Sequence, residues 1–409
     1  MKTKTYLSLS FMMFLEFFIW GVWYVSAGNY LSSIGFQGIE IGRAFSTLAW
    51  GSIISAFFVS LIAYRFFSAE KLNGILHLIG GGLMYVVSQI TDPQLFFWVL
   101  LLYMICYMPT IALSNTIALH HTPNAGKQFP QIRVLGTVGW IVGGITISLL
   151  DLEFGPYPMM MAAGASIILG LYSFFLPKTP PHKSASKVKI KDIIGLDALK
   201  LMKNKSFAIL IVSTLLISIP FAMYFQYTNM SMNEAGIDNV AGLMSMGQMS
   251  EVIFMLLMPL IFIRLGIKRM LLLGMVAWIV RYSLFAFGNN TELISFFYIG
   301  IILHGICYDF FYVTAQIYVD KKVPTSLRAS MQGLLTFITY GVGWLIGTNL
   351  SGWELKRGQI MEGSEVVGHN WQSIMLVPAA IALVVSVLFI VFFKQEKGKI
   401  DISGEPGII

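Results

Sequence analysis

Residues 241–263 read AGLMSMGQMSEVIFMLLMPLIFI, an apolar stretch long enough to cross a lipid bilayer as a helix. A single acid, Glu251, lies in the middle of this stretch, three residues after Gln248. A carboxylate in hydrocarbon is costly, so an acid at such a place is by default a functional candidate. Other apolar stretches also contain charged residues, namely Glu16, Arg133, Arg281 and Asp309. Buried charges in an otherwise apolar chain are typical of a membrane transporter.

The composition of the whole chain agrees with a membrane protein. Of its 409 residues, 56% are hydrophobic and 11% are charged, whereas about 25% of the residues in an ordinary soluble domain are charged. A helix that spans a bilayer needs about 20 mainly apolar residues, because each backbone amide must be bonded within its own segment. We therefore predict an all-α, polytopic membrane protein with twelve transmembrane helices, near residues 5–33, 42–63, 73–91, 95–118, 132–150, 156–176, 206–229, 241–263, 270–288, 293–318, 326–350 and 372–394.

One long polar segment, residues 177–205, interrupts the series of apolar stretches. It begins with three prolines and carries eight lysines, and it leaves six predicted helices on either side. We expect two pseudo-repeated six-helix bundles, residues 1–176 and 206–394, joined by a basic linker at 177–205 and followed by a tail at 395–409.

The distribution of lysine and arginine predicts the orientation of the chain, because cytoplasmic loops collect these residues. If the N-terminus is cytoplasmic, the loops on that side hold 22 of the 27 basic residues. The opposite side holds only Arg43, Lys356 and Arg357, and the remaining basic residues lie within spans. We predict that both termini are cytoplasmic, and we interpret the net charge of +7 as a consequence of this topology.

Several other classes of protein are disfavoured. A nucleic-acid-binding protein needs a basic patch on one folded face, whereas these lysines are spread over loops between apolar runs. Cys106 and Cys307 both fall within predicted spans, so neither a disulfide framework nor a zinc site is indicated, and we expect no metal or cofactor. The first apolar stretch is too long for a cleavable signal peptide, and we expect it to remain as the first helix.

Polar and aromatic residues of the first span recur at helical spacing. Glu16, Trp20 and Trp23 follow one another at i, i+4 and i+7, so they share one face, which we expect to look into the bundle. The tryptophans could instead anchor the helix at the membrane interface. We interpret Glu16 as a functional residue because of the cost of an intramembrane acid.

The fifth predicted span repeats this spacing with Arg133, Thr137 and Trp140. Such a strip can bind a flat polar ligand, with the indole stacked on a ring while the guanidinium bonds to its polar edge. In the alternative interpretation, Arg133 lies about one turn inside the span and extends its charged head to the cytoplasmic surface.

Two pairs of polar residues lie in consecutive spans of the second half. Gln226 and Asn229 are three residues apart, as are Gln248 and Glu251, so each pair faces one way. Carboxamides offer both donors and acceptors, which suits a ligand that is rich in hydroxyl or amide groups. Such residues also bond neighbouring helices as structural contacts.

The tenth predicted span carries His304, Tyr308 and Asp309. His304 and Tyr308 share a face, whereas Asp309 points about 140° away from His304 at a rotation of about 100° per residue. We therefore expect Asp309 to form a structural ion pair with Arg281 of the preceding span.

A count of the intramembrane charges predicts a proton site. Three acids face two arginines, and 3 − 2 leaves one acid without a cationic partner. A buried carboxylate without such a partner takes up a proton, so it can load the proton on one side of the membrane and release it on the other. The candidates for this proton-coupling acid are Glu251, Asp309 and Glu16.

A set of short motifs is spread over nearly the whole chain: Met108-Pro109-Thr110 with Asn115-Thr116-Ile117, Phe129-Pro130-Gln131-Ile132-Arg133, Gly136-Thr137-Val138-Gly139, Leu196-Asp197-Ala198, Thr228-Asn229-Met230, Gln248-Met249-Ser250-Glu251, Tyr308-Asp309-Phe310-Phe311, and Arg328-Ala329-Ser330 with Gln332-Gly333. Together they resemble the bacterial nucleoside:proton symporters, a family of nucleoside permeases within the major facilitator superfamily.

The resemblance implies the major facilitator fold and the import of purine and pyrimidine nucleosides across the bacterial cytoplasmic (inner) membrane, driven by the inward proton gradient with alternating access. The expected partners are nucleosides, protons and the lipid bilayer, with no nucleic acid, and we expect the chain to act as a monomer. The implied nucleoside-binding residues coincide with the strips chosen by spacing: Arg133, Thr137, Trp140, Gln226, Asn229, Gln248, Glu251, His304 and Tyr308.

The chain departs from the pattern of this family at several positions. His304 stands where an aromatic residue is expected, Glu16 where a glutamine is expected, and Trp140 where a phenylalanine is expected. His304 could stack like an aromatic residue, bond to the base or titrate near neutrality. The basic gating loop of the superfamily is reduced to Ala63-Tyr64-Arg65-Phe66, which contains no acid.

Two alternative functions remain at this point. A symporter or facilitator for a sugar or another polar metabolite would use the same carboxamides and tryptophans. A membrane sensor or an intramembrane enzyme fits poorly, because the sequence shows no soluble signalling domain, no cluster of histidine and acid at metal-ligand spacing, and no nucleophile with an evident base.

Overall fold

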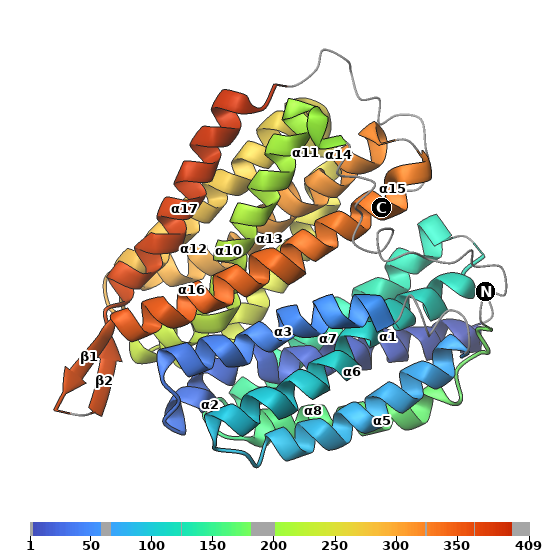
Figure 1. The fold of residues 1–409 in the computed structure, drawn as a ribbon, viewed down its shortest axis with the longest axis horizontal. Helices are drawn as coiled ribbons and strands as arrows, with labels where there is room; N and C mark the ends of the chain where they lie inside the picture. The colour runs from blue at the N-terminus through green and yellow to red at the C-terminus, as the bar shows by residue number, and fades with distance from the viewer. Residues whose placement is uncertain are drawn as a thin grey trace. The chain divides into compact units, whose positions relative to one another are not determined.

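The computed structural model of the chain describes residues 3–58, 67–123, 125–180, 201–323, 325–363 and 365–394. Most of the predicted linker, residues 181–200, lies outside the described residues, and so do the predicted tail at 395–409 and the reduced loop at 63–66. Apart from one short hairpin, the described regular structure is helical, and the helices divide into two compact units (Figure 1). We call them the N-terminal unit and the C-terminal unit.

The N-terminal unit contains the helices that precede the predicted linker. Residues Gln37–Arg43, which contain the start of helix α3 (Gly38–Phe58), are grouped with the C-terminal unit instead. The helices are α1 (Thr3–Tyr24), α2 (Ala27–Ser33), α3 (Gly38–Phe58), α5 (Ala69–Val87), α6 (Pro93–His120), α7 (Ala125–Leu149) and α8 (Tyr157–Ser173). Helix α6 starts at a proline, which needs no amide partner at that position, and the side chain of Asp92 accepts a hydrogen bond from the amide of Leu95.

Glycines allow α1 and α7 to approach closely in this unit. A Cβ atom on Gly143 would lie 2.8 Å from the backbone nitrogen of Val22, and a Cβ atom on Gly21 would lie 2.8 Å from backbone atoms of Trp140. Small residues at such crossings bring helix backbones into contact in membranes, where packing replaces the hydrophobic effect. The position of Trp140 against α1 therefore follows from the glycines around it.

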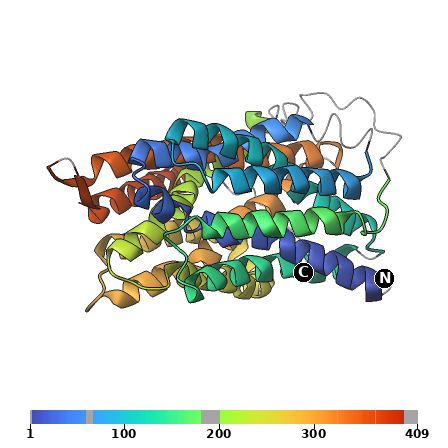
Figure 2. The same ribbon diagram turned by 90° about the horizontal axis from the view of Figure 1, so that it is seen from below.

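The C-terminal unit contains α10 and all the elements that follow it. These are α10 (Lys205–Glu234), α11 (Val240–Phe287), α12 (Ile294–Ile302), α13 (His304–Tyr308), the π-helix η3 (Asp309–Val313), α14 (Thr314–Lys322), α15 (Thr325–Thr336), the π-helix η4 (Phe337–Gly343), α16 (Trp344–Arg357), β1 (Gln359–Glu362), β2 (Glu365–His369) and α17 (Trp371–Phe392). Within each unit the long helices run roughly side by side, as Figure 2 shows.

The helices have the length and surface of membrane spans. Within the described ranges, seven helical segments are long and apolar enough to cross a bilayer, and an eighth results if Ile294–Ile302 and His304–Val319, which are bent by 40°, count as one span. Many large apolar side chains face outward, among them Leu256, Leu260 and Ile263, which are 63%, 64% and 72% exposed. Contiguous exposure of this kind suits contact with lipid. The chain is thus an all-α polytopic membrane protein, and the number of twelve spans stays a prediction.

The element α11 consists of two helical segments that meet at a kink at Gly266, between the predicted spans 241–263 and 270–288. One feature was absent from the sequence-based prediction: the strands β1 and β2 form an antiparallel hairpin between α16 and α17. Glu234, at the end of α10, accepts hydrogen bonds from the ring and the amide of His369 and from the indole of Trp371, which attaches this hairpin to the bundle.

Candidate functional site

Glu16 lies at the centre of a buried polar network in the N-terminal unit. Its carboxylate is fully buried and accepts hydrogen bonds from the hydroxyls of Thr110 and Ser114 on α6, at 2.7 and 2.8 Å. His77 on α5, which is 1% exposed, places its Nε2 atom 3.1 Å from the same carboxylate. The prediction that Glu16 faces into the bundle is therefore correct, and its partner is a histidine that spacing did not select.

The strip on α7 lies against α1. The guanidinium carbon of Arg133 is 3.9 Å from the centre of the Phe17 ring, and the side chain is half-buried. Arg133 of α7 thus packs against α1, and Thr137 is also half-buried. Trp140 is 8% exposed, and its ring meets that of Trp20 edge to face at 5.2 Å. The two tryptophans form one aromatic group, so Trp20 packs inside the unit.

Helix α10 carries the first carboxamide pair into the interior of the C-terminal unit. Gln226 is 1% exposed, and neither atom of its side-chain amide has a hydrogen-bond partner within the described part of the chain. The oxygen of Asn229 accepts a hydrogen bond from Asn233 at 2.9 Å. A buried amide without a partner costs free energy, so Gln226 is available to a ligand, whereas Asn229 already contacts its own helix.

Glu251, His304 and Arg281 form a row of hydrogen-bonding groups in the same unit. Arg281 is fully buried, and its Nη1 atom lies 3.0 Å from Nδ1 of His304. A guanidinium can only donate, so Nδ1 accepts and the proton of a neutral imidazole is carried by Nε2. That nitrogen lies 3.8 Å from the carboxylate of Glu251. The side-chain nitrogen of Gln248 is 3.4 Å from it, but both atoms are donors in this tautomer, so they do not bond to each other. Arg281 thereby fixes the orientation of His304 towards Glu251.

Aromatic rings enclose this row. The guanidinium carbon of Arg281 is 3.5 Å from the centre of the Tyr224 ring, and His304 stacks on Tyr224 at 5.2 Å. His304 is 2% exposed, so the packed rings and the arginine hold it in one position. Glu251 is 22% exposed and is the most accessible charged group of the row.

The predicted ion pair between Arg281 and Asp309 is wrong. Asp309 is fully buried, and among the described residues neither of its carboxylate oxygens has a hydrogen-bond partner. Arg281 bonds to His304 instead. Because Asp309 is rotated by about 140° from His304 along the same span, a guanidinium that reaches His304 lies on the other side of the helix. The charge that interacts with Asp309 is the like charge of Glu251.

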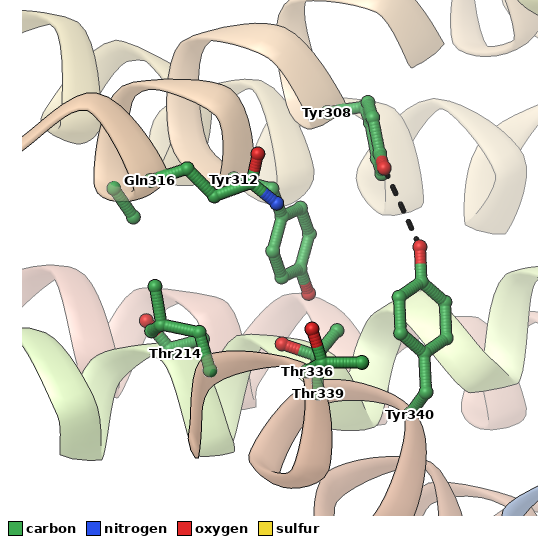
Figure 3. A pocket seen from close by; sticks show the side chains of 9 residues that line it. Thr214, Tyr308, Tyr312, Gln316, Thr336, Thr339 and Tyr340 are labelled. Atoms are coloured by element: carbon green, nitrogen blue, oxygen red, sulfur yellow. Dashed lines mark hydrogen bonds between the residues drawn. The ribbon is translucent and has the colours of Figure 1, made fainter. Parts of the chain in front are cut away.

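Tyr308 lines a small polar cavity within the C-terminal unit (Figure 3). The hydroxyls of Tyr308 and Tyr340 are 3.4 Å apart, and the cavity of about 20 Å³ is just large enough for a water molecule. Tyr312 and Gln316 of the same span, together with Thr214, Thr336 and Thr339, supply most of the other polar lining. The ring of Tyr308 also stacks on His304 at 6.4 Å, which joins the cavity to the row around Glu251.

Some residues of these networks escaped the sequence analysis. His77 lies inside the predicted span 73–91, and a titratable residue at that depth is a functional signal in itself. It was missed because only acids and arginines entered the charge count. Tyr224 and Tyr340 gave no signal, because the sequence does not distinguish tyrosines that line a site from those that pack. No group of His, Cys, Asp or Glu among the described residues is arranged to hold a metal ion.

Comparison with known proteins shows the family of the chain. The pattern of the nucleoside H⁺ symporter family matches residues 1–398. The chain is 41% identical to the candidate nucleoside transporter YegT of Escherichia coli (strain K12), over 97% of this chain and 96% of that one. It is 34% identical to the xanthosine permease of the same organism, over 95% and 96%. The crystal structure of the nucleoside transporter NupG superimposes with a TM-score of 0.86 at 30% identity, and the match covers 96% of this chain and 100% of that one.

Proposed function

This chain belongs to the nucleoside H⁺ symporter family of membrane transporters, and from that premise we propose how its residues bind a nucleoside and a proton. It is a transporter and not an enzyme, and it has the fold of the major facilitator proteins. Its function is the proton-coupled import of nucleosides.

Each unit contains polar and aromatic groups that can contact a nucleoside. In the C-terminal unit, Glu251 accepts hydrogen bonds from the ribose hydroxyls, and the amide of Gln226 can both donate to them and accept from them. Gln248 lies beside Glu251, and Tyr308 stacks on the base. The observation that carries this assignment is the buried amide of Gln226, which has no partner among the described residues. A bound hydroxyl satisfies that amide, so binding offsets the cost of burying it. His304 positions Glu251 and does not contact the ligand.

The N-terminal unit contributes a flat face and a cation. The paired rings of Trp20 and Trp140 offer indole surface for stacking, and Arg133 and Thr137 supply donors for the polar edge of a nucleobase. In the C-terminal unit, Asn229 adds a further polar group to the surface of α10, and its side chain is already bonded to Asn233.

Asp309 carries the coupled proton in the C-terminal unit. A charged carboxylate that is fully buried without a hydrogen bond, close to the like charge of Glu251, is strongly disfavoured. The neutral acid removes this repulsion, and the charges of Glu251 and Arg281 then balance. Asp309 therefore holds a proton while it is shielded from water and releases it when water reaches it.

The test of this function is the uptake of labelled uridine and adenosine into membrane vesicles, with and without a pH gradient, in competition with xylose. We expect both nucleosides to accumulate in the vesicles. This accumulation should be lost when the pH gradient is removed, and xylose should not reduce it. Uptake of labelled xylose in place of the nucleosides contradicts the assignment of substrate.

A second measurement tests the proton site. Asp309→Asn keeps the size of the side chain and cannot release a proton, so exchange of uridine at equal pH persists while its gradient-driven accumulation falls. The fall is about tenfold for each pH unit of the gradient if one proton is lost from the cycle, because one pH unit supplies about 1.4 kcal/mol per proton. Full accumulation by this variant excludes Asp309 as the proton carrier.

The setting of the transporter follows from the distribution of charge. The protein lies in the bacterial cytoplasmic (inner) membrane with both termini in the cytoplasm, because the basic loops then lie inside. Its two pseudo-repeated bundles, residues 1–176 and 206–394, alternate access to the substrate around the basic linker at 177–205. It works as a monomer and binds no nucleic acid.

A further inference from the structure

The pair formed by Glu16 and His77 lies in the N-terminal unit and takes no part in the sites assigned above. Both side chains are enclosed, with Glu16 fully buried and His77 1% exposed, and Nε2 of the ring is 3.1 Å from the carboxylate. The pair joins α1 to α5, while α6 and α8 supply the hydroxyls around it. Two titratable groups at this depth, in direct contact, are a place where a proton can be held.

The hydrogen bonds around the ring allow two arrangements of hydrogens. The oxygen of Ser166 lies 3.0 Å from the backbone oxygen of His77 and 3.0 Å from Nδ1 of the same residue. A hydroxyl has one hydrogen, so if Ser166 donates to Nδ1, the ring hydrogen lies on Nε2 and fills the contact with the carboxylate. If Ser166 donates to the backbone oxygen, Nδ1 carries a hydrogen and the contact between Nε2 and the carboxylate takes a second one, either on Nε2 or on Glu16.

With that second hydrogen the pair has no net charge. It is an imidazolium beside a carboxylate, or a neutral imidazole beside a carboxylic acid. Without the hydrogen the pair carries one negative charge in a site closed to water, which costs several kcal/mol or more. Thr110 and Ser114 each donate a single hydrogen bond to Glu16, which supports a carboxylate but does not replace a cation.

Two tyrosines and one arginine also lie near the pair. Tyr107 of α6 donates its hydroxyl to the backbone oxygen of Glu16 at 2.6 Å, and Tyr103 of the same helix interacts with Glu16 electrostatically. From α7, Arg133 lies over the ring of Phe17, next to Glu16 in the chain, and interacts electrostatically with Tyr107. Its cation lowers the cost of a negative charge nearby, but the histidine is the group in hydrogen-bond contact.

We propose that Glu16 and His77 together form a second proton-binding site of this transporter, which must be loaded whenever it is closed to water. This rests on the proposed proton-coupled import and adds a proton to it. Loading forms one N–H or O–H bond with a proton from the side where water has access, and release breaks the same bond towards water on the other side. Because the empty pair is charged, the unit resists closing around it, and this couples the step to the proton.

The experiment uses the full-length protein in proteoliposomes and the double variant Glu16→Gln with His77→Gln. These amides fill similar space and keep hydrogen-bonding groups at both positions, but they cannot titrate. Ser173→Ala is the matched control, because it removes the buried hydrogen bond between Asn73 and Ser173 at 3.2 Å, which joins the same helices α5 and α8 without a titratable group. Two quantities are measured: uridine exchange at equal pH and the steady-state accumulation of uridine under an inward proton gradient.

We expect the double variant to exchange uridine like the control, while its accumulation falls about tenfold for each pH unit of the gradient, as expected when one proton is lost from the cycle. Accumulation equal to that of the control overturns the proposal and leaves the pair a structural contact. Absence of exchange in the unaltered protein contradicts the proposed function instead. In that event a potentiometric titration still decides on the pair: the unaltered protein must release one proton more than the double variant on going from neutral to alkaline pH, and coincident curves refute the site.

Discussion

Glu251 is exposed enough to contact a ligand, whereas His304 and Arg281, which hold it in place, are buried. Its carboxylate lies 3.8 Å from Nε2 of His304, and Arg281 orients that histidine. A carboxylate in this position can accept hydrogen bonds from two adjacent ribose hydroxyls, and bonds of this charged kind contribute about 1.5–3 kcal/mol each. Binding of the sugar is therefore the role that suits Glu251, and proton transfer is left to Asp309.

Glu251→Gln accordingly weakens nucleoside binding without uncoupling transport. The KM for uridine exchange rises on the order of 10- to 100-fold, which corresponds to the loss of one charged hydrogen bond. The accumulation ratio reached at saturating uridine stays the same. Kinetics of exchange and accumulation in the same vesicles check both parts, and an unchanged KM with lost accumulation would make Glu251 the proton site.

The residues of the site show what a single sequence can and cannot predict. Gln226, Gln248 and Glu251 were predicted because polar residues inside apolar runs stand out, and the structure places all three inside the C-terminal unit. The pairing of Arg281 could not be predicted, because the order of the spans along the chain does not say which face of each helix meets its neighbour. The sequence indicated Asp309 as the partner of Arg281, whereas in the structure Arg281 packs on Tyr224 and bonds to His304.

At the scale of elements, hydropathy does not predict where the helices end or bend. The tenth span changes from α-helix to π-helix at Asp309, and the eleventh does so at Phe337. A π-helical turn widens the helix and often occurs at functional sites. Here the first of them begins at the proposed proton carrier. Apolar composition is the same in both kinds of helix, so these turns could not be predicted from hydropathy.

The bend in α11 depends on one glycine. Gly266 has φ 69° and ψ 171°, a backbone conformation that essentially only glycine adopts, at a cost of about 1–3 kcal/mol for other residues. Gly266→Ala lowers the unfolding temperature of the detergent-solubilised protein by a few degrees. Gly82→Ala is the control, because a Cβ atom there meets nothing within 4 Å, and alanine favours the helix. Equal unfolding temperatures for both variants would show that the bend tolerates a side chain.

The ends of α5 and α6 are joined through His121, outside the apolar part of the spans. Its Nε2 atom lies 3.1 Å from the hydroxyl of Thr179, and Thr179 bonds to Glu70 and Ala69 through its backbone. Burial lowers the pKa of His121 below its usual value, and the neighbouring charge of His120 acts in the same direction. The folded protein therefore binds fewer protons than the unfolded chain near this pKa.

Stability should consequently fall as the pH drops below the ordinary histidine pKa of about 6.5, because the unfolded state then takes up a proton that folded His121 resists. The unfolding temperature is measured from neutral to mildly acidic pH. His121→Asn keeps a hydrogen-bonding group and loses part of this dependence, whereas His120→Asn, at an exposed position, keeps most of it. Identical pH profiles for the two variants would contradict a role of His121.

At the scale of the whole molecule, the general architecture was accessible from hydropathy alone. Every predicted span overlaps a helix in the described part of the chain, because a bilayer demands long apolar helices wherever the chain crosses it. The hairpin of β1 and β2 was not predicted, since it is short and depends on the long-range contact of Glu234 with His369 and Trp371. Polar loops carry no periodic signal, so only the contacts reveal such an element.

The orientation of the chain yields the last prediction. If the basic loops are cytoplasmic, the hairpin lies on the outer side of the membrane and the segment after α8 lies inside. Cysteines at two exposed positions, Glu362→Cys in the hairpin and Lys178→Cys after α8, are introduced after both native cysteines have been replaced by alanine. A membrane-impermeant maleimide added to spheroplasts should label Glu362→Cys only, and in inverted vesicles it should label Lys178→Cys only. The reverse pattern would invert the topology, and labelling of both cysteines from one side would place an even number of spans between them where an odd number is required.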